Sequence, residues 1–149
     1  MLTIRLLAAA LIAFLPMAAC ARPEGRADET RSSGPGVAFA SGSFDEALAR
    51  ARSEKRLVLV DVYTDWCGWC KKLDREVFAD ARVAEATRAL VAVRVNAEEG
   101  GGEKVAQRYD VQGFPTVLFV DGSGNVVKRI DGYVDAAKML RIISALPKA

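Results

Sequence analysis

The 149-residue chain contains no histidine and only three cysteines, Cys20, Cys67 and Cys70. Without imidazole it cannot build a Ser-His-Asp triad, a Cys-His dyad or a histidine-ligated zinc site. Three thiols are too few for a four-thiolate metal site within one chain, and they also exclude a dense disulfide framework. We therefore expect no metal site.

The net charge is also low: the chain has 21 basic and 19 acidic residues, which gives a net charge of +2. Such a balance provides no electrostatic footprint for nucleic acid, so we expect no nucleic-acid partner. Apolar residues make up 51% of the chain, which argues against disorder of the whole. The length fits one compact domain of roughly 100–150 residues, and we expect a monomer.

Residues 1–19 predict an export signal. A short start with one positive charge, Arg5, precedes an uninterrupted apolar run from Leu6 to Leu15, and Pro16 ends the run. This run is shorter than the roughly 20 residues that span a bilayer, so it favours a signal peptide over a permanent transmembrane helix.

The residues before Cys20 resemble the lipobox, the cleavage site of bacterial lipoproteins, although Met17 stands where leucine is usual. The resemblance implies that Cys20 becomes the lipidated first residue of the mature chain. The protein would then be periplasmic and anchored to a membrane by its lipid. The alternative is ordinary cleavage after Ala21, with Ala19 and Ala21 as the small pair, which would remove Cys20.

Residues 20–36 predict a flexible tether between this signal and a folded domain over residues 37–149. Gly, Pro, Ser and charged residues dominate the tether, which has almost no apolar side chains. A coil of this length reaches on the order of 20–25 Å, enough to lift a small domain off a membrane surface.

Hydrophobic periodicity predicts that helices and strands alternate within residues 37–149. The spacing of Ser43 and Glu46 is typical of a capping box at the first helix. The early alternation requires parallel pairing through right-handed crossovers, and the last two strands form a hairpin. We expect an α/β domain with a mixed central sheet and helices on both faces. Helices are predicted over 43–54, 67–78, 82–89, 103–109 and 135–146, and strands over 57–63, 91–95, 116–120 and 126–130.

The chemistry is predicted to lie at Cys67-Gly68-Trp69-Cys70, which follows a strongly apolar strand and opens a helix. Two cysteines three residues apart share a helix face and can close a small disulfide ring. The free N–H groups and the positive dipole end of the helix should lower the pKa of Cys67 below the usual 8.5 or so. We expect Cys67 to attack a disulfide and Cys70, one turn deeper and more buried, to resolve the mixed disulfide.

Other uses of this C-x-x-C motif are weaker. Zinc would need more ligands, and haem attachment would need a histidine where Lys71 stands. A purely structural disulfide across so short a loop would restrict the chain little. The acidic, glycine-rich segment 98–103 lacks the Lys-Ser/Thr of a phosphate-binding loop and is expected to be an ordinary loop. A redox-active dithiol therefore remains, with no organic cofactor.

Motifs spread over residues 37–149 resemble the thioredoxin superfamily, and the resemblance implies a thioredoxin-like fold. The segment 65–72, with Glu76-Val77-Phe78 after it, looks closest to the periplasmic C-terminal domain of the transmembrane thiol-disulfide interchange protein. The matching features are Asp61 six residues before Cys67, Trp66 before the first cysteine, Gly113-Phe114-Pro115-Thr116 where the family has a cis-proline, and Gly132 where it has a glycine.

The resemblance also implies roles for these residues. Asp61 would be a buried acid that exchanges protons with Cys70. Arg94 stands where a lysine pairs with that acid, although arginine cannot donate the proton. The Phe114–Pro115 peptide bond would be cis, and its loop would pair with an extended substrate peptide. The predicted substrate groove consists of Trp66, Gly68, Trp69, Phe114, Pro115 and Thr116.

The sequence departs from thioredoxins at two positions near the cysteines. Trp69 replaces the proline of the family motif, and Arg75 replaces a helix-kinking proline. Strong oxidants of the family often carry histidine between the cysteines, so its absence here favours a reductase or electron carrier.

The predicted function is therefore an exported thiol-disulfide oxidoreductase that reduces, or relays electrons to, protein or peptide disulfides. An upstream thiol donor would reduce the Cys67–Cys70 disulfide again after each reaction. Two alternatives stay open: a disulfide oxidase or isomerase, and a non-catalytic peptide-binding or chaperone-like module of the same fold.

Overall fold

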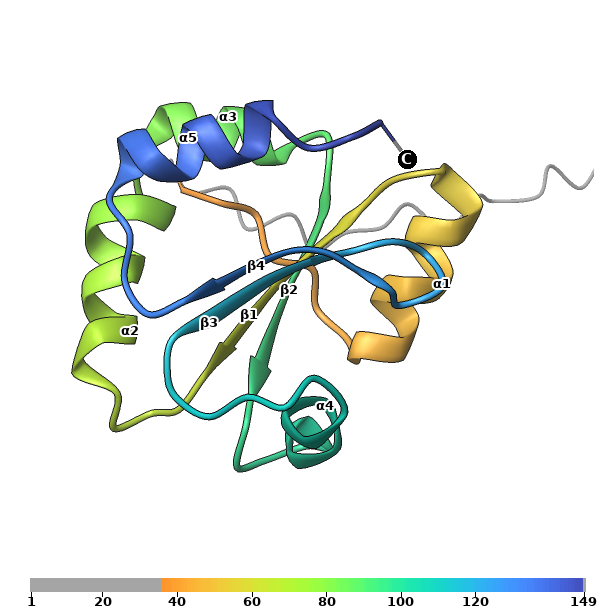
Figure 1. Cartoon of the computed structure of the whole chain (residues 1–149), viewed down its shortest axis with the longest axis horizontal. Coiled ribbons are helices and arrows are strands. Elements are labelled where there is room, and N and C mark those ends of the chain that lie inside the picture. Colours follow the sequence, from red (N-terminus) through yellow and green to blue (C-terminus); the bar gives the residue numbers. More distant parts are fainter. Residues whose placement is uncertain (1–35, 149) are drawn as a thin grey trace, which may run out of the picture.

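Four strands form the centre of the fold, in the order β2-β1-β3-β4 (Figure 1). The structure is a computed structural model and describes residues 36–148. The strands are β1 (Val58–Tyr63), β2 (Val91–Asn96), β3 (Thr116–Val120) and β4 (Val126–Asp131). β1 pairs in parallel with β2 and antiparallel with β3, and β3 pairs antiparallel with β4. The predicted mixed sheet and its closing hairpin are confirmed.

Helices cover both faces of this sheet, as predicted (Figure 1). One face packs against α2 (Gly68–Leu73), its continuation η1 (Asp74–Phe78), α3 (Ala81–Thr87) and α5 (Ala136–Ser144). The other face packs against α1 (Phe44–Glu54) and α4 (Gly102–Arg108). Two apolar cores result, one on each side of the sheet.

Alternation along the strands decides which core each side chain enters, because successive residues of a strand point to opposite faces. In β1, Val58, Val60 and Val62 pack with α1 and α4, whereas Leu59 packs with α2, α3 and α5. Asp61 is two residues from Leu59 and therefore lies on the α2 face. Arg94 is its register partner on β2 and lies on the same face.

The start of α1 confirms the predicted capping box. The Ser43 hydroxyl accepts a hydrogen bond from the backbone N–H of Glu46, and the Glu46 carboxylate accepts one from the backbone N–H of Ser43 at 2.7 Å. Phe44, Leu48 and Ala51 then form the buried face of the helix.

The single helix predicted over 67–78 is wrong in its second half. α2 ends at Leu73, and residues Asp74–Phe78 continue as a π-helix. The Ala79 N–H bonds to the Asp74 carbonyl five residues back, at 3.0 Å. This wider turn accompanies the burial of two consecutive side chains, Val77 and Phe78, against the sheet. Two consecutive buried residues do not follow the 3.6-residue spacing of an α-helix face, so the hydrophobic pattern could not predict the π-helix.

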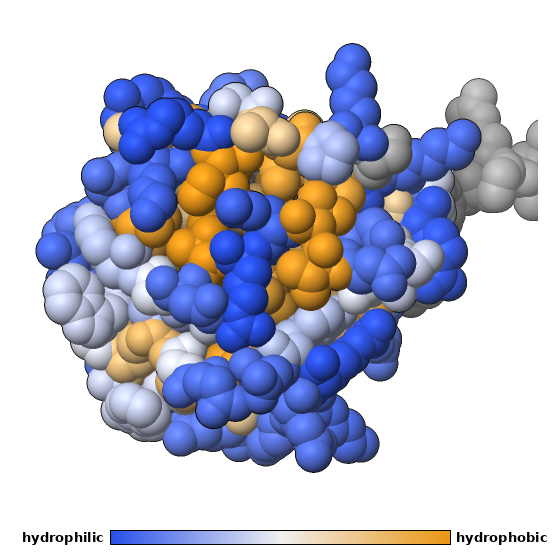
Figure 2. Space-filling view, viewed as in Figure 1, coloured by the Kyte–Doolittle hydropathy of each residue, from blue (hydrophilic) through white to orange (hydrophobic). Residues whose placement is uncertain are grey.

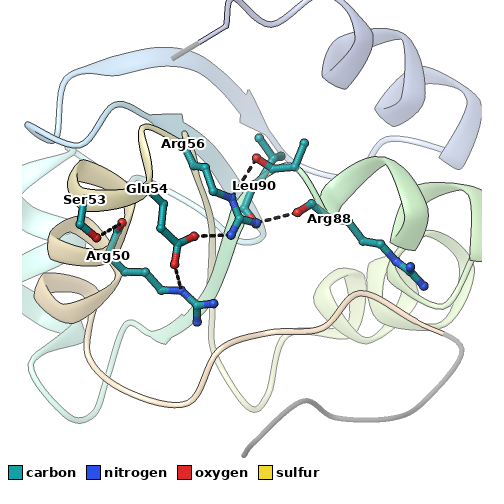
Figure 3. A network of polar contacts seen from close by, with 7 residues as sticks. Arg50, Ser53, Glu54, Arg56, Arg88 and Leu90 are labelled. Atoms are coloured by element: carbon teal, nitrogen blue, oxygen red, sulfur yellow. Dashed lines mark hydrogen bonds and ion pairs between the residues drawn. The ribbon is translucent and has the colours of Figure 1, made fainter. Parts of the chain in front are cut away.

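Arg56 fastens the end of α3 to the connection between α1 and β1 (Figure 3). Its guanidinium donates hydrogen bonds to the carbonyl oxygens of Arg88 at 2.6 Å, of Ala89 at 3.2 Å and of Leu90. It also pairs with the Glu54 carboxylate at 2.5 Å. Arg56 thus satisfies the carbonyl groups of the C-cap residue of α3 and of the two residues that lead into β2.

β4 lies at one edge of the sheet and leaves Val126 47% exposed. On this side of the molecule, apolar residues gather between α5 and α1, with hydrophilic residues around and between them (Figure 2). Within residues 36–148, no helix combines the length and apolar character needed to cross a membrane. The predicted export signal and Cys20 lie outside the described residues.

Candidate active site

Cys67 and Cys70 are joined by a disulfide at the start of α2, where Cys67 is the N-cap residue. The Cys70 backbone N–H donates a hydrogen bond to the Cys67 sulfur at 3.0 Å. Cys67 is 4% exposed and Cys70 is 2% exposed. Cys70 is the more buried, as predicted, but only by a small margin. After reduction, the same amide would stabilise a thiolate on Cys67.

Gly68, between the two cysteines, borders open space. A Cβ atom added there would meet no heavy atom within 4 Å. The connection before it is held by the Cys67 N–H, which donates to the Thr64 carbonyl at 3.2 Å. The backbone between the two cysteines is therefore not covered by a neighbouring side chain at Gly68.

Asp61 supplies a buried carboxyl group on the α2 face of the sheet. It is 1% exposed, and burial raises its pKa from 3.8 to about 6, an effect that the Arg94 guanidinium partly offsets. Arg94 donates to Oδ2 at 3.0 Å, whereas Oδ1 has no hydrogen-bond partner among the described residues. The group can thus exist in either protonation state near neutral pH, as a proton-exchanging acid requires.

Arg94 bridges two carboxylates. Its Nε atom donates to Asp61, and its Nη2 atom lies 3.0 Å from Oδ1 of Asp74, at the start of η1. The guanidinium also lies over the Tyr63 ring, 4.3 Å from the centroid. The predicted pairing of Arg94 with Asp61 is confirmed. The negative charge of Asp74 contributes to the raised pKa of Asp61.

The Phe114–Pro115 peptide bond is cis, as the resemblance implied. The loop before β3 and the start of α2 lie at the same end of the sheet (Figure 1). The Gly132 N–H donates to the Pro115 carbonyl at 2.8 Å, and the Thr116 hydroxyl donates to the Gly113 carbonyl at 2.8 Å. Thr116 is fully buried, so its side chain stabilises the loop.

Within the described part of the chain, the backbone N–H and C=O of Phe114 form no backbone hydrogen bond. They remain available to an extended peptide, which would pair with them as an added strand does. The loop therefore offers the docking groups that the sequence predicted, while substrate contact itself stays a prediction.

Trp66 directly precedes Cys67 and is 67% exposed. Its ring meets the Phe114 ring edge to face, with the centroids 6.0 Å apart. Its indole N–H donates to both carboxylate oxygens of Glu98, at 3.0 and 3.1 Å. An indole held by one ring and one carboxylate is oriented before any substrate arrives.

Close packing at Gly102 holds the loop that carries Glu98. A Cβ atom at Gly102 would lie 1.8 Å from the Asn96 carbonyl oxygen, so only glycine fits where α4 begins against the end of β2. The Asn96 side chain accepts a hydrogen bond from the Glu98 N–H at 3.1 Å. The glycine-rich segment is thus a spacer that places Glu98.

Trp69 lies between the two cysteines, in the first turn of α2, and is 57% exposed. Its ring lies 5.8 Å, centroid to centroid, from the ring of Tyr133, in the loop between β4 and α5. Trp66, Gly68 and Trp69 are chain neighbours of the two cysteines, and Phe114 contacts Trp66. Their part in substrate binding stays a prediction.

Three neighbours of the site were not predicted: Asp74, Glu98 and Tyr133. Asp74 follows Cys70 by four residues, and this spacing on one helix could have indicated it. Glu98 follows the end of β2, and the carboxyl ends of parallel strands meet at one edge of a sheet. Tyr133 had no such signal, because its place depends on how the loop after β4 folds back.

A cavity of about 420 Å³ adjoins the cis-proline loop but contains neither cysteine. Its arginine, Arg129, is already bonded to Asp131 at 2.8 Å and to the carbonyls of Tyr109 and Asp110. Between residues 36 and 148, no cluster of three metal-ligating side chains occurs. The cavity lining is Asp110, Gln112, Gly113, Phe114, Arg129, Asp131 and Gly132.

Comparisons with known proteins agree with this geometry. The thioredoxin-like domain family matches residues 44–147. The thiol:disulfide interchange protein DsbD of Yersinia pestis is 32% identical over 101 residues, which cover 65% of this chain and 17% of that protein. The chain thus spans only about a sixth of the length of this curated relative.

Two solved structures are also similar. A putative disulphide-isomerase from Bacteroides thetaiotaomicron is 40% identical, with a TM-score of 0.66, covering 76% of this chain and 94% of that one. The oxidised C-terminal domain of DsbD from Neisseria meningitidis has a TM-score of 0.58 over 68% of this chain and 90% of its own. At 21% identity, the latter shows the shared fold alone. The disulfide at Cys67 and Cys70 is that of a thiol-disulfide oxidoreductase.

Proposed function

Because this chain belongs to the thioredoxin-like domain family, we propose that it reduces, or relays electrons to, protein disulfides. The observation that carries the proposal is the disulfide of Cys67 and Cys70 at the start of a helix, next to the strand that holds Asp61. A dithiol in this place can cycle between two thiols and one disulfide without any further group.

The reaction proceeds in two exchanges. The Cys67 thiolate attacks a substrate disulfide, forms a mixed disulfide and releases one substrate thiol. Cys70 gives its proton to Asp61 and attacks the Cys67 sulfur, which releases the second substrate thiol and leaves the Cys67–Cys70 disulfide. Two electrons pass to the substrate, and an upstream dithiol donor returns two electrons to the protein.

Burial supports the reducing direction. Both sulfurs are almost fully buried, and one backbone amide reaches Cys67. Burial disfavours a thiolate, and a less stable reduced form means a lower potential. No histidine lies between the cysteines to offset this effect.

The test of direction is the reduction potential of the purified protein, equilibrated against glutathione buffers. We expect a value below about −230 mV, toward that of thioredoxin at about −270 mV. A value above about −180 mV would show that the protein donates disulfides or isomerises them. The similarity to a putative disulphide-isomerase from Bacteroides thetaiotaomicron favours that second candidate.

Replacement of both cysteines tests the non-catalytic alternative. We expect Cys67→Ser/Cys70→Ser to abolish cellular function, because no other thiol pair exists in the chain. Unchanged function would support a peptide-binding module instead. The single variant Cys70→Ser should accumulate mixed disulfides with the substrate proteins and so identify them by mass spectrometry.

The proposed location is the periplasm, with the chain tethered by lipid on Cys20. Its support is the sequence of residues 1–36, which combines an export signal, a lipobox-like site and a polar tether. Labelling with radioactive palmitate should mark the wild-type chain but not Cys20→Ala. A mature chain that begins at Arg22 and carries no label would show ordinary secretion.

A further inference from the structure

Trp69 is held by a second group of side chains, here called the Trp69 clamp, which consists of Trp69, Lys72, Glu76 and Tyr133. Its members come from α2, from η1 and from the loop after β4. Nothing in the proposed chemistry requires these contacts, because none of them belongs to the disulfide, the buried acid or the cis-proline loop.

The clamp contacts form a closed set. The Lys72 ammonium lies 5.2 Å from the centroid of the Trp69 ring and 4.7 Å from that of the Tyr133 ring, so it covers both. The Tyr133 hydroxyl donates to the Glu76 carboxylate at 2.7 Å. Glu76 also lies 3.9 Å from the Lys72 ammonium. Each member therefore touches at least two others.

Tyr133 also connects the clamp to the cis-proline loop through its neighbour. Gly132 bonds to the Pro115 carbonyl, so the residue before Tyr133 is fixed to the loop that faces a substrate. Gly132 has φ 81°, a conformation that glycine adopts freely. The position of Trp69 relative to the cis-proline loop is thus determined through Tyr133.

These contacts orient Trp69 rather than bury it. More than half of Trp69 remains exposed, so it adds little to either core. An exposed aromatic ring that is already oriented loses little conformational entropy when it binds a partner. Trp66 is held in the same way by Glu98 and Phe114, on the other side of Gly68.

We infer that Tyr133 is a positioning residue that holds Trp69 as a second indole in contact with a substrate polypeptide. This inference rests on the proposed function. A substrate sulfur that approaches over Gly68 would carry its chain between two oriented indoles. The site would therefore favour a disulfide presented on a polypeptide over a small disulfide, which cannot reach both rings.

The test compares two disulfide substrates, insulin and oxidised glutathione, with dithiothreitol as the electron source. Tyr133→Ala removes the ring that supports Trp69, so KM for insulin should rise about two- to tenfold while kcat changes little. The rate with oxidised glutathione should stay within twofold. Tyr133→Phe keeps the ring under Lys72 and should restore most of the affinity.

A spectroscopic measurement checks the positioning directly. In a Trp66→Phe background, Trp69 is the only tryptophan, since the chain has two. Adding Tyr133→Ala should increase quenching of its fluorescence by acrylamide. Tyr109→Phe serves as the control, because it removes one hydroxyl that bonds to the Gly124 carbonyl, away from both cysteines.

Three results would each overturn the inference. They are a KM for insulin that is the same in Tyr133→Ala and wild type, an equal loss of activity on insulin and on oxidised glutathione, and an unchanged acrylamide quenching of Trp69. If Tyr133→Ala does not fold at the assay temperature, Lys72→Met and Glu76→Ala remove the other supports from the surface and carry the same test. A wild-type protein that reduces neither substrate would instead contradict the proposed function.

Discussion

The carboxyl group of Asp61 is buried among leucine, valine and phenylalanine side chains on one face of the sheet. Burial disfavours its charged form, and Arg94 compensates only in part. The native protein therefore holds this proton up to about pH 6, whereas the unfolded chain releases it near pH 3.8. Stability accordingly falls as pH rises from about 4 to about 6, and then levels off.

Asp61→Asn should remove this pH dependence. Relative to wild type, the variant should gain on the order of 3 kcal/mol in the free energy of unfolding between pH 4 and pH 7, since each pKa unit corresponds to about 1.4 kcal/mol. Urea unfolding of the oxidised protein across this range measures the gain. Glu85→Gln, at an exposed ion pair, is the matched control. If the difference in free energy of unfolding between Asp61→Asn and wild type does not change with pH, the role of burial is contradicted.

Arg94→Met tests the cation between the two carboxylates. Without Arg94 the pKa of Asp61 should rise above 6, because burial and Asp74 then act unopposed. The variant should lose about 2–3 kcal/mol of stability at pH 7.5, where Asp61 is charged, and less at pH 4.5, where it is protonated. Arg94→Lys retains the charge and should lose less. Equal losses at both pH values would show that Arg94 acts by packing alone.

At the scale of elements, the connection from α3 to β2 depends on a residue outside it. α3 ends at Thr87 and β2 begins at Val91, so Arg88, Ala89 and Leu90 form this connection. Arg56 reaches the carbonyls of Arg88, Ala89 and Leu90 from the connection before β1 (Figure 3). The order of α3 and the entry to β2 thus depend on a contact between segments more than 30 residues apart.

Arg56→Met should lower the free energy of unfolding by about 2 kcal/mol, because it leaves these carbonyls without their charged donor. Arg88→Met is the matched control: that side chain makes only an exposed pair with Glu85 and should change stability by less than about 0.5 kcal/mol. Chemical denaturation of both variants provides the comparison. Similar losses in both would refute the capping role of Arg56.

At the scale of the whole molecule, the redox state and the folding equilibrium are linked. A disulfide that is hard to reduce in the folded protein must stabilise that fold relative to the reduced form. The ring of Cys67 and Cys70 is short, and closure of such a ring restricts the unfolded chain by only about 2 kcal/mol. The stability difference between the two forms therefore reports the direction of electron flow.

A reducing role predicts that the oxidised protein is the more stable form, by about 2 kcal/mol or more. Urea unfolding with and without dithiothreitol measures this difference. A more stable reduced form is the property of a strong disulfide oxidant, and it would oppose the proposed direction.

Features that depend on near neighbours in the chain were predictable. The capping box at Ser43 and Glu46 and the cysteine spacing are local patterns. β1, β2 and β3 were recognisable because both faces of the sheet are covered and their residues are therefore mostly apolar, whereas the edge strand β4 was recognisable from the turn that joins it to β3. Pairing of Asp61 with Arg94 followed from the strand order that the resemblance implied.

The residue types and their spacing by themselves determined the strands, most helix boundaries and the place of the dithiol, because backbone propensity, capping and period act over a few residues. The π-turn of η1, the bridge from Arg94 to Asp74, and the contacts of Glu98 and Tyr133 were decided by the folded arrangement. The contacts of Arg94, Glu98 and Tyr133 join side chains from different elements, and their distances exist only once the two cores have packed around the sheet. The π-turn accompanies the burial of Val77 and Phe78 in one of these cores.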